Sequence, residues 1–191
     1  LGLQQGFDYY SAPGEKKARR DGGETASLAL DWLWWMQGRV FLWYHTYDPH
    51  GPWDKWDTSI SRPRSKSEKR KSKGRKPAQI PSYQWIPGHT DSGLYEELYA
   101  RAVEYADEQI GRIIKNLKAS GRYDDSLIVL TADHGESFTE RHLWFDHGTA
   151  AYEEQLHVPL IIKYPQGMSG GSKHTQLVGL EDVAPTLLEA L

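Results

Sequence analysis

The sequence predicts an α/β fold, a three-layer α/β/α sandwich in which helices cover both faces of a parallel-type sheet. Two observations predict this class. Helix-like and strand-like segments alternate along the 191 residues, and the strand-like segments are continuously apolar, as strands buried on both faces are. A third observation excludes another class: no apolar run approaches the ~20 residues that a bilayer span needs, so we expect no transmembrane helix.

Two long helices are predicted from apolar residues at helical spacing. The first covers residues 24–37 and ends at Gly38. Its apolar face consists of Leu30, Leu33, Trp34 and Met36. The second covers residues 94–119, and Gly121 stands where a helix C-cap is expected. Its apolar stripe consists of Val103, Ala106, Ile110, Ile113, Ile114 and Leu117.

Three buried strands are predicted from unbroken apolar or aromatic runs of strand length. They are VFLWYH at 40–45, SLIVLTA at 126–132 and VPLIIKY at 158–164. Residues 177–180 read as a short fourth strand, which leads into a final helix from Val183. We expect the strands that end near His45 and Ala132 to be close together in one sheet.

A long irregular stretch runs from Tyr47 to about Thr90 and contains a basic, low-complexity insertion at residues 61–76. The insertion holds nine Lys or Arg and one Glu, a local charge of +8, which leaves −11 for the remainder of a chain whose net charge is −3. Such a strip can attract a polyanion, but it has no aromatic side chains for base stacking. We therefore favour a solvated surface insertion and expect no specific nucleic-acid partner.

The ends and the composition of the chain indicate a piece of a larger protein. The sequence begins at Leu1 rather than Met, and it ends at Leu191 inside a helical pattern. It contains no cysteine, so these 191 residues hold no disulfide, no thiolate metal site and no cysteine nucleophile. We expect a partial domain over residues 1–191.

Polar clusters follow two of the predicted strands, at the strand ends where ligands bind in such sheets. Asp48-Pro-His50 follows the first strand, and Asp133-His134-Gly135-Glu136 follows the second. A carboxylate beside an imidazole suits a divalent cation. The same pair also fits a helix-capping Asp next to a surface His, so the residues alone leave both interpretations open.

The segment LTADHGESFTERHLWFDHGTAAYEEQLHVPLIIKYP resembles the sulfatases of the alkaline phosphatase superfamily. FLWYHTYDPHGPW and LVGLEDVAPTLLEAL resemble further elements of the same family, in family order. The resemblance covers nearly the whole chain except the basic insertion. It implies an alkaline-phosphatase-like fold whose N-terminal part is missing here, and a periplasmic or secreted parent enzyme that hydrolyses a sulfated small molecule or glycan.

The resemblance also implies roles for four residues. Asp133 and His134 match the family's second pair of metal ligands, usually for calcium, although calcium prefers oxygen and His134 is therefore the less typical ligand. His50 matches the active-site histidine near the leaving-group oxygen, and His147 matches a residue that contacts the sulfate.

Two family elements have no counterpart in this sequence. The family's nucleophile is the Cys or Ser of a C-x-P-x-R or S-x-P-x-R motif, which is oxidised to formylglycine. The five-residue segments that begin at Ser11 and Ser61 both lack the final Arg. The family's first Asp-Asp metal pair is absent as well. We therefore expect half an active site and no activity of the chain alone. A phosphodiesterase or phosphonate hydrolase of the same superfamily, and a non-catalytic polyanion-binding protein, remain alternatives.

Overall fold

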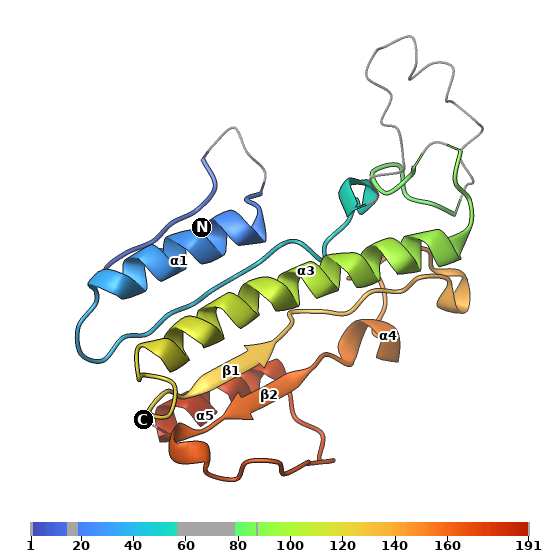
Figure 1. The fold of residues 1–191 in the computed structure, drawn as a ribbon. Coiled ribbons are helices and arrows are strands. Elements are labelled where there is room, and N and C mark those ends of the chain that lie inside the picture. Colours follow the sequence, from blue (N-terminus) through green and yellow to red (C-terminus); the bar gives the residue numbers. More distant parts are fainter. Residues whose placement is uncertain (1, 15–18, 57–78, 87, 191) are drawn as a thin grey trace. The chain divides into compact units, whose positions relative to one another are not determined.

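The computed structural model describes residues 2–14, 19–56, 79–86 and 88–190, and its ribbon is drawn in Figure 1. The chain divides into two compact units, Leu1–Ala119 and Ser120–Leu191, each of which is described by itself. The basic insertion at 61–76 lies entirely outside the described residues. The expectation of a solvated insertion therefore stays a prediction.

Two helices form the framework of the first unit, and both were predicted from the sequence. Helix α1 spans Gly22–Trp35 and helix α3 spans Ser92–Ala119, and a 3₁₀ turn covers Asp54–Trp56. The Asp21 carboxylate caps α1 by accepting two backbone N–H groups of its first turn. The Tyr105 hydroxyl of α3 donates to the same carboxylate at 2.7 Å, which ties the start of α1 to the middle of α3.

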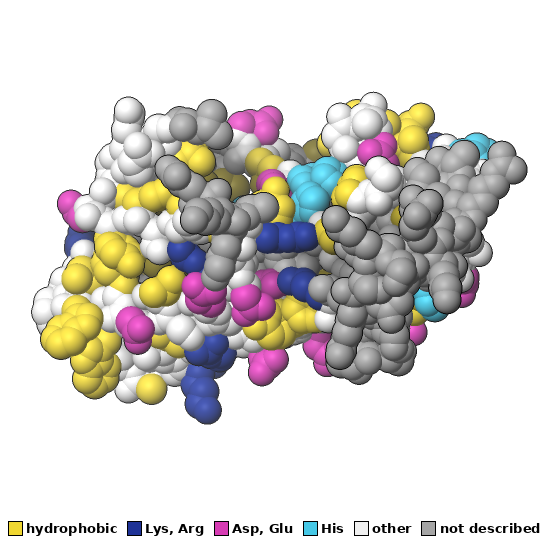
Figure 2. Space-filling model, turned by 90° about the horizontal axis from the view of Figure 1, so that it is seen from above, with side chains coloured by type: hydrophobic (Ala, Val, Ile, Leu, Met, Phe, Trp, Pro, Cys, Tyr) yellow, Lys and Arg dark blue, Asp and Glu magenta, His cyan; other side chains and the backbone are white. Residues whose placement is uncertain are grey.

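The buried faces of these helices differ in part from the predicted apolar stripes. The buried apolar side chains of the first unit are Ala26, Leu33, Trp53, Ile80, Ile86, Tyr95, Leu98, Ala102, Ala106 and Ile113. Trp34 and Val103, which were predicted on the covered faces, are exposed. Spacing identifies an apolar side of a helix, but the neighbouring chain decides which part of that side is covered. Figure 2 shows several hydrophobic side chains at the surface.

The predicted strand at residues 40–45 is wrong for the described structure. The segment is irregular chain that follows α1, and it joins no ladder among the described residues. Its burial nevertheless alternates, because Leu42 and Tyr44 are half-buried whereas Phe41 and Trp43 are exposed. An apolar run with period two can follow an extended path, but a strand also needs a hydrogen-bonding neighbour.

The second unit contains a two-stranded sheet made from two of the predicted strands. Strand β1 spans Ile128–Thr131 and pairs with β2, Leu160–Lys163, in a register that places Ile128 opposite Lys163. The pair is antiparallel, so the predicted parallel arrangement is wrong for it. A parallel pair needs a crossover that is usually a long helix. The connection here contains a 3₁₀ turn at Glu140–His142 and the four-residue helix α4, Glu153–Leu156, and neither is a long crossover helix.

The end of the second unit is helical, as predicted, but the short strand expected at 177–180 is absent from the described chain. Leu177 is fully exposed, and a 3₁₀ turn at Leu180–Asp182 leads directly into helix α5, Val183–Ala190. The Asp182 carboxylate accepts the Gly179 N–H at 2.8 Å, and this hydrogen bond closes the turn. The Gly179 N–H is therefore used within the turn and does not pair with a neighbouring strand. None of the described helices combines the length and hydropathy of a membrane-crossing segment.

Candidate active site

A glycine turn directs the chain that leaves β1. The Gly135 N–H donates to the Gln155 carbonyl in α4 at 2.7 Å. A side chain at Gly135 would place its Cβ only 2.2 Å from the Glu154 carbonyl oxygen, which belongs to the backbone and cannot swing away. Glycine is therefore required at this position because α4 approaches so closely. This contact fixes the direction in which Asp133 and His134 leave the strand.

Asp133 and His134 form the part of the site expected to bind a metal. His134 Nδ1 lies 2.8 Å from the Gly135 carbonyl, which can only accept, so Nδ1 carries the proton and the neutral ring has its lone pair on Nε2. That Nε2 lies 3.9 Å from Asp133 Oδ1. Two ligands within about 2.0–2.6 Å of one ion can lie several ångströms apart, so this pair fits a shared cation.

The fit is limited by the number of ligands. Within the described parts of the chain, no group of three or more His, Cys, Asp or Glu side chains is arranged to hold a metal ion. The Asp133 side chain is 75% exposed and the His134 side chain 37%. The chemistry of the donors thus suits a divalent cation, but only as part of a larger set of ligands.

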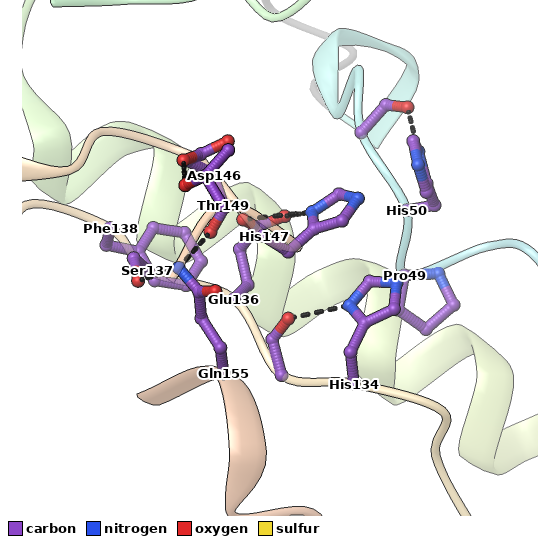
Figure 3. A network of polar contacts seen from close by, with 12 residues as sticks. Pro49, His50, His134, Glu136, Ser137, Phe138, Asp146, His147, Thr149 and Gln155 are labelled. Atoms are coloured by element: carbon purple, nitrogen blue, oxygen red, sulfur yellow. Dashed lines mark hydrogen bonds and ion pairs between the residues drawn. The ribbon is translucent and has the colours of Figure 1, made fainter. Parts of the chain in front are cut away.

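His147 packs directly against His134 (Figure 3). The two rings are stacked, with centroids 4.1 Å apart and planes 16° apart. His147 Nδ1 also lies 3.2 Å from a carboxylate oxygen of Glu136, whose side chain is only 6% exposed. His147, which we expect to contact the sulfate, therefore lies next to His134, one of the two expected metal ligands.

Burial disfavours the charged forms of both partners in the Glu136–His147 contact. It raises the pKa of Glu136 to about 7; the nearby charge of His134 opposes this rise and that of Asp146 adds to it. Burial, followed by the charge of His134, lowers the pKa of His147. The raised pKa of Glu136 and the lowered pKa of His147 both favour the neutral forms, so their contact is better described as a hydrogen bond than as a full ion pair.

A small bridge explains why Glu136 and His147 meet. Ser137 and Asp146 exchange backbone hydrogen bonds of 3.1 and 3.3 Å, which makes the preceding residue 136 and the following residue 147 neighbours across the bridge. The buried Gln155 donates to the Ser137 hydroxyl at 3.0 Å and to the Asp146 carbonyl at 3.2 Å. Gln155 thereby clamps both sides of the bridge from α4 (Figure 3).

His50 stands in the first unit, on the turn that follows the irregular segment. The turn is anchored by Asp48, which is 1% exposed, pairs with Lys55 Nζ at 3.1 Å and accepts the Thr46 hydroxyl at 2.5 Å. Trp53, which is fully buried, donates its indole N–H to the Pro49 carbonyl at 2.7 Å. Asp48 is thus a structural anchor of the turn rather than an exposed ligand.

The structure therefore brings together three of the four predicted site residues, Asp133, His134 and His147. His50 belongs to the other unit, and its convergence with them stays a prediction. The contact of Glu136 with His147 and the role of Gln155 were not predicted from the sequence. A signal for Glu136 was present, because a carboxylate directly after the Asp-His-Gly turn is adjacent to the predicted site.

Comparisons with known proteins identify the class. The sulfatase family model matches residues 4–191. The chain is 30% identical over 193 aligned residues to the N-acetylglucosamine-6-O-sulfatase of Bacteroides thetaiotaomicron, covering 96% of this chain and 32% of that protein. It is 37% identical over 91 residues to the choline-sulfatase of Rhizobium meliloti, covering 48% of this chain and 17% of that protein.

A solved structure supports the same fold. The crystal structure of yidJ from Bacteroides fragilis matches with a TM-score of 0.60 and 24% identity, over 90% of this chain and 37% of that one. The chain therefore belongs to the sulfatase family, within the alkaline phosphatase superfamily. It spans about one third of the length of the first relative and of the solved structure.

Proposed function

We propose that these residues form part of the catalytic centre of a sulfuric ester hydrolase, a sulfatase. The observation that carries the proposal is the stacking of His147 on His134, the side chain that follows Asp133. It places the group expected to bind sulfate beside the groups expected to bind a cation. Membership of the sulfatase family supports the same reaction class.

Asp133 and His134 would hold a divalent cation, and we propose calcium. The bound cation would supply fixed positive charge close to the sulfate oxygens, where negative charge develops during hydrolysis. Because calcium takes about six to eight ligands, the remaining ligands must come from water or from residues beyond these 191. We also propose that such residues complete the sheet of a three-layer sandwich.

The chain's own histidines would position and protonate the substrate. His147, held by Glu136 through Nδ1, presents its opposite edge to a sulfate oxygen. His50, whose Nδ1 lies 2.7 Å from the Gly51 carbonyl, would take up a second proton on Nε2, and the resulting imidazolium would deliver that proton to the departing alkoxide. The nucleophile would be a formylglycine supplied by residues outside this sequence, since the 191 residues contain neither cysteine nor an S-x-P-x-R motif.

Hydrolysis of two chromogenic esters tests the proposal. The longest natural polypeptide that contains these residues should hydrolyse an aryl sulfate with calcium present, and much faster than an aryl phosphodiester. The 191-residue chain alone should hydrolyse neither, because it lacks a nucleophile. Preferential hydrolysis of the phosphodiester would contradict the sulfatase proposal. Turnover of the aryl sulfate by the isolated chain, if abolished by Asp133→Ala, would contradict the proposal that its site is incomplete.

A further inference from the structure

Three successive carbonyl groups of the turn around His50 accept hydrogen bonds from side chains. Trp53 holds the Pro49 carbonyl. The Arg19 guanidinium holds the next two, because its Nη1 donates to the His50 carbonyl at 3.0 Å and to the Gly51 carbonyl at 2.9 Å. The Nη1 group carries two N–H bonds, so it can serve both acceptors at once.

The Gly51 carbonyl also determines the protonation of the His50 ring. His50 Nδ1 lies 2.7 Å from this oxygen, and a carbonyl only accepts, so the contact requires a proton on Nδ1. A carbonyl oxygen has two lone pairs and can therefore accept from Arg19 and from His50 together. The direction of one carbonyl thus decides which ring nitrogen of His50 carries the proton in the neutral state.

Glycine alone would not keep that carbonyl in place. The backbone of a glycine rotates more freely than that of any other residue, so the Gly51 carbonyl needs an external constraint. The buried Gln84 closes one side, since a Cβ on Gly51 would lie 1.9 Å from Gln84 Nε2. That contact limits the position of the Gly51 Cα, whereas the hydrogen bond from Arg19 limits the orientation of its carbonyl.

We propose that Arg19 is a positioning residue for His50, which acts by holding the Gly51 carbonyl and so fixing the His50 ring as the Nδ1-protonated tautomer. The consequence for catalysis rests on the proposed function: a ring held through its Nδ1 proton takes up its second proton on Nε2, and this is the proton that the proposed general acid gives to the leaving group. The tautomer itself does not depend on any activity of the protein. The two proposals can therefore fail separately.

Nitrogen-15 NMR of the histidine rings tests the proposal directly. Spectra of the longest natural polypeptide, labelled with ¹⁵N-histidine, are recorded at about pH 9, where histidine rings are ordinarily neutral, and the His50 signals are assigned with His50→Gln. The native protein should show a protonated Nδ1 and an unprotonated Nε2 for His50. Arg19→Met, which keeps the aliphatic length without the donors, should give a mixture of the two tautomers.

Arg20→Met is the matched control. Arg20 is the neighbouring arginine, but it donates to the Ala12 carbonyl at 2.6 Å and lies 3.7 Å from Glu24, so its loss should leave the His50 signals unchanged. Arg19→Gln, whose amide is too short to reach both carbonyls, should shift the tautomer in the same direction as Arg19→Met. A native His50 protonated on Nε2, or folded Arg19 variants with an unchanged Nδ1-protonated ring, would overturn the proposal.

The catalytic effect is measured separately. In the longest natural polypeptide, Arg19→Met should lower kcat for an aryl sulfate by about 10- to 100-fold with little change in KM, since misorientation of a catalytic group acts on the transition state. If the native enzyme has no sulfatase activity, the proposed function fails while the NMR result still decides the role of Arg19.

Discussion

Replacement of His147 by alanine should lower kcat for aryl sulfate hydrolysis by about 10²–10⁴-fold in the longest natural polypeptide. The imidazole stacks on His134 and is held by Glu136, so alanine removes both the expected sulfate contact and the group that packs on the metal pair. His147→Gln retains a side-chain polar group and should recover only part of the rate. Steady-state kinetics with a chromogenic aryl sulfate measures both variants.

His157→Ala is the matched control for this prediction. His157 lies on the same unit, but its side chain is 78% exposed and pairs with Glu153 on the surface of α4. Its removal should change kcat by less than about twofold, because surface substitutions away from the site are usually close to neutral. Equal rates for the native enzyme and a folded His147→Ala variant would remove His147 from the site.

Replacement of Asp133 by alanine should weaken calcium binding by at least about 100-fold, since even partners of metal ligands commonly contribute 10- to 100-fold. Asp133 provides the carboxylate oxygen of the pair, and oxygen is the donor that calcium prefers. His134 alone cannot compensate, because a single imidazole nitrogen is a poor calcium ligand. Calorimetric titration of calcium into the chelator-treated longest natural polypeptide, native and Asp133→Ala, measures the loss of affinity.

An exposed carboxylate elsewhere provides the control for Asp133. Asp107 lies on the exposed side of α3, in the first unit, and Asp107→Ala removes the same charge from the protein. Calcium affinity should be the same in this variant as in the native protein, which excludes a general effect of net charge. An Asp133→Ala variant that binds calcium as tightly as the native protein would show that the cation binds at another place.

Sequence patterns predicted the positions of the helices and strands whose apolar residues recur at short, regular spacing. Helix α3 was predicted within two residues of each end, and β1 and β2 were found inside the predicted apolar runs. The direction of the β1–β2 pairing was predicted wrongly, because strand composition does not encode the direction of the neighbouring strand. The aromatic run at 40–45 was misassigned for a similar reason, since a strand depends on a partner that its own residues do not specify.

The site was predictable where motifs are contiguous and missed where contacts depend on register. Asp133 and His134 are adjacent in the sequence, and their common position after β1 was confirmed. The contact of Glu136 with His147 depends on the Ser137–Asp146 bridge, which no spacing rule reveals. Arg19 lies 31 residues from His50, so its hydrogen bonds to that turn could not be inferred without coordinates.

A crystal structure of the longest natural polypeptide with sulfate bound tests the central claim most directly. The claim is that His50 from the first unit and Asp133, His134 and His147 from the second serve one sulfate. The account predicts that His50 and His147 each place a ring nitrogen within hydrogen-bonding distance of the same sulfate, about 2.7–3.2 Å from an oxygen. Side chains of His50 and Asp133 that lie more than roughly 15 Å apart, far beyond ion-to-ligand distances of ~2–2.6 Å, would contradict it.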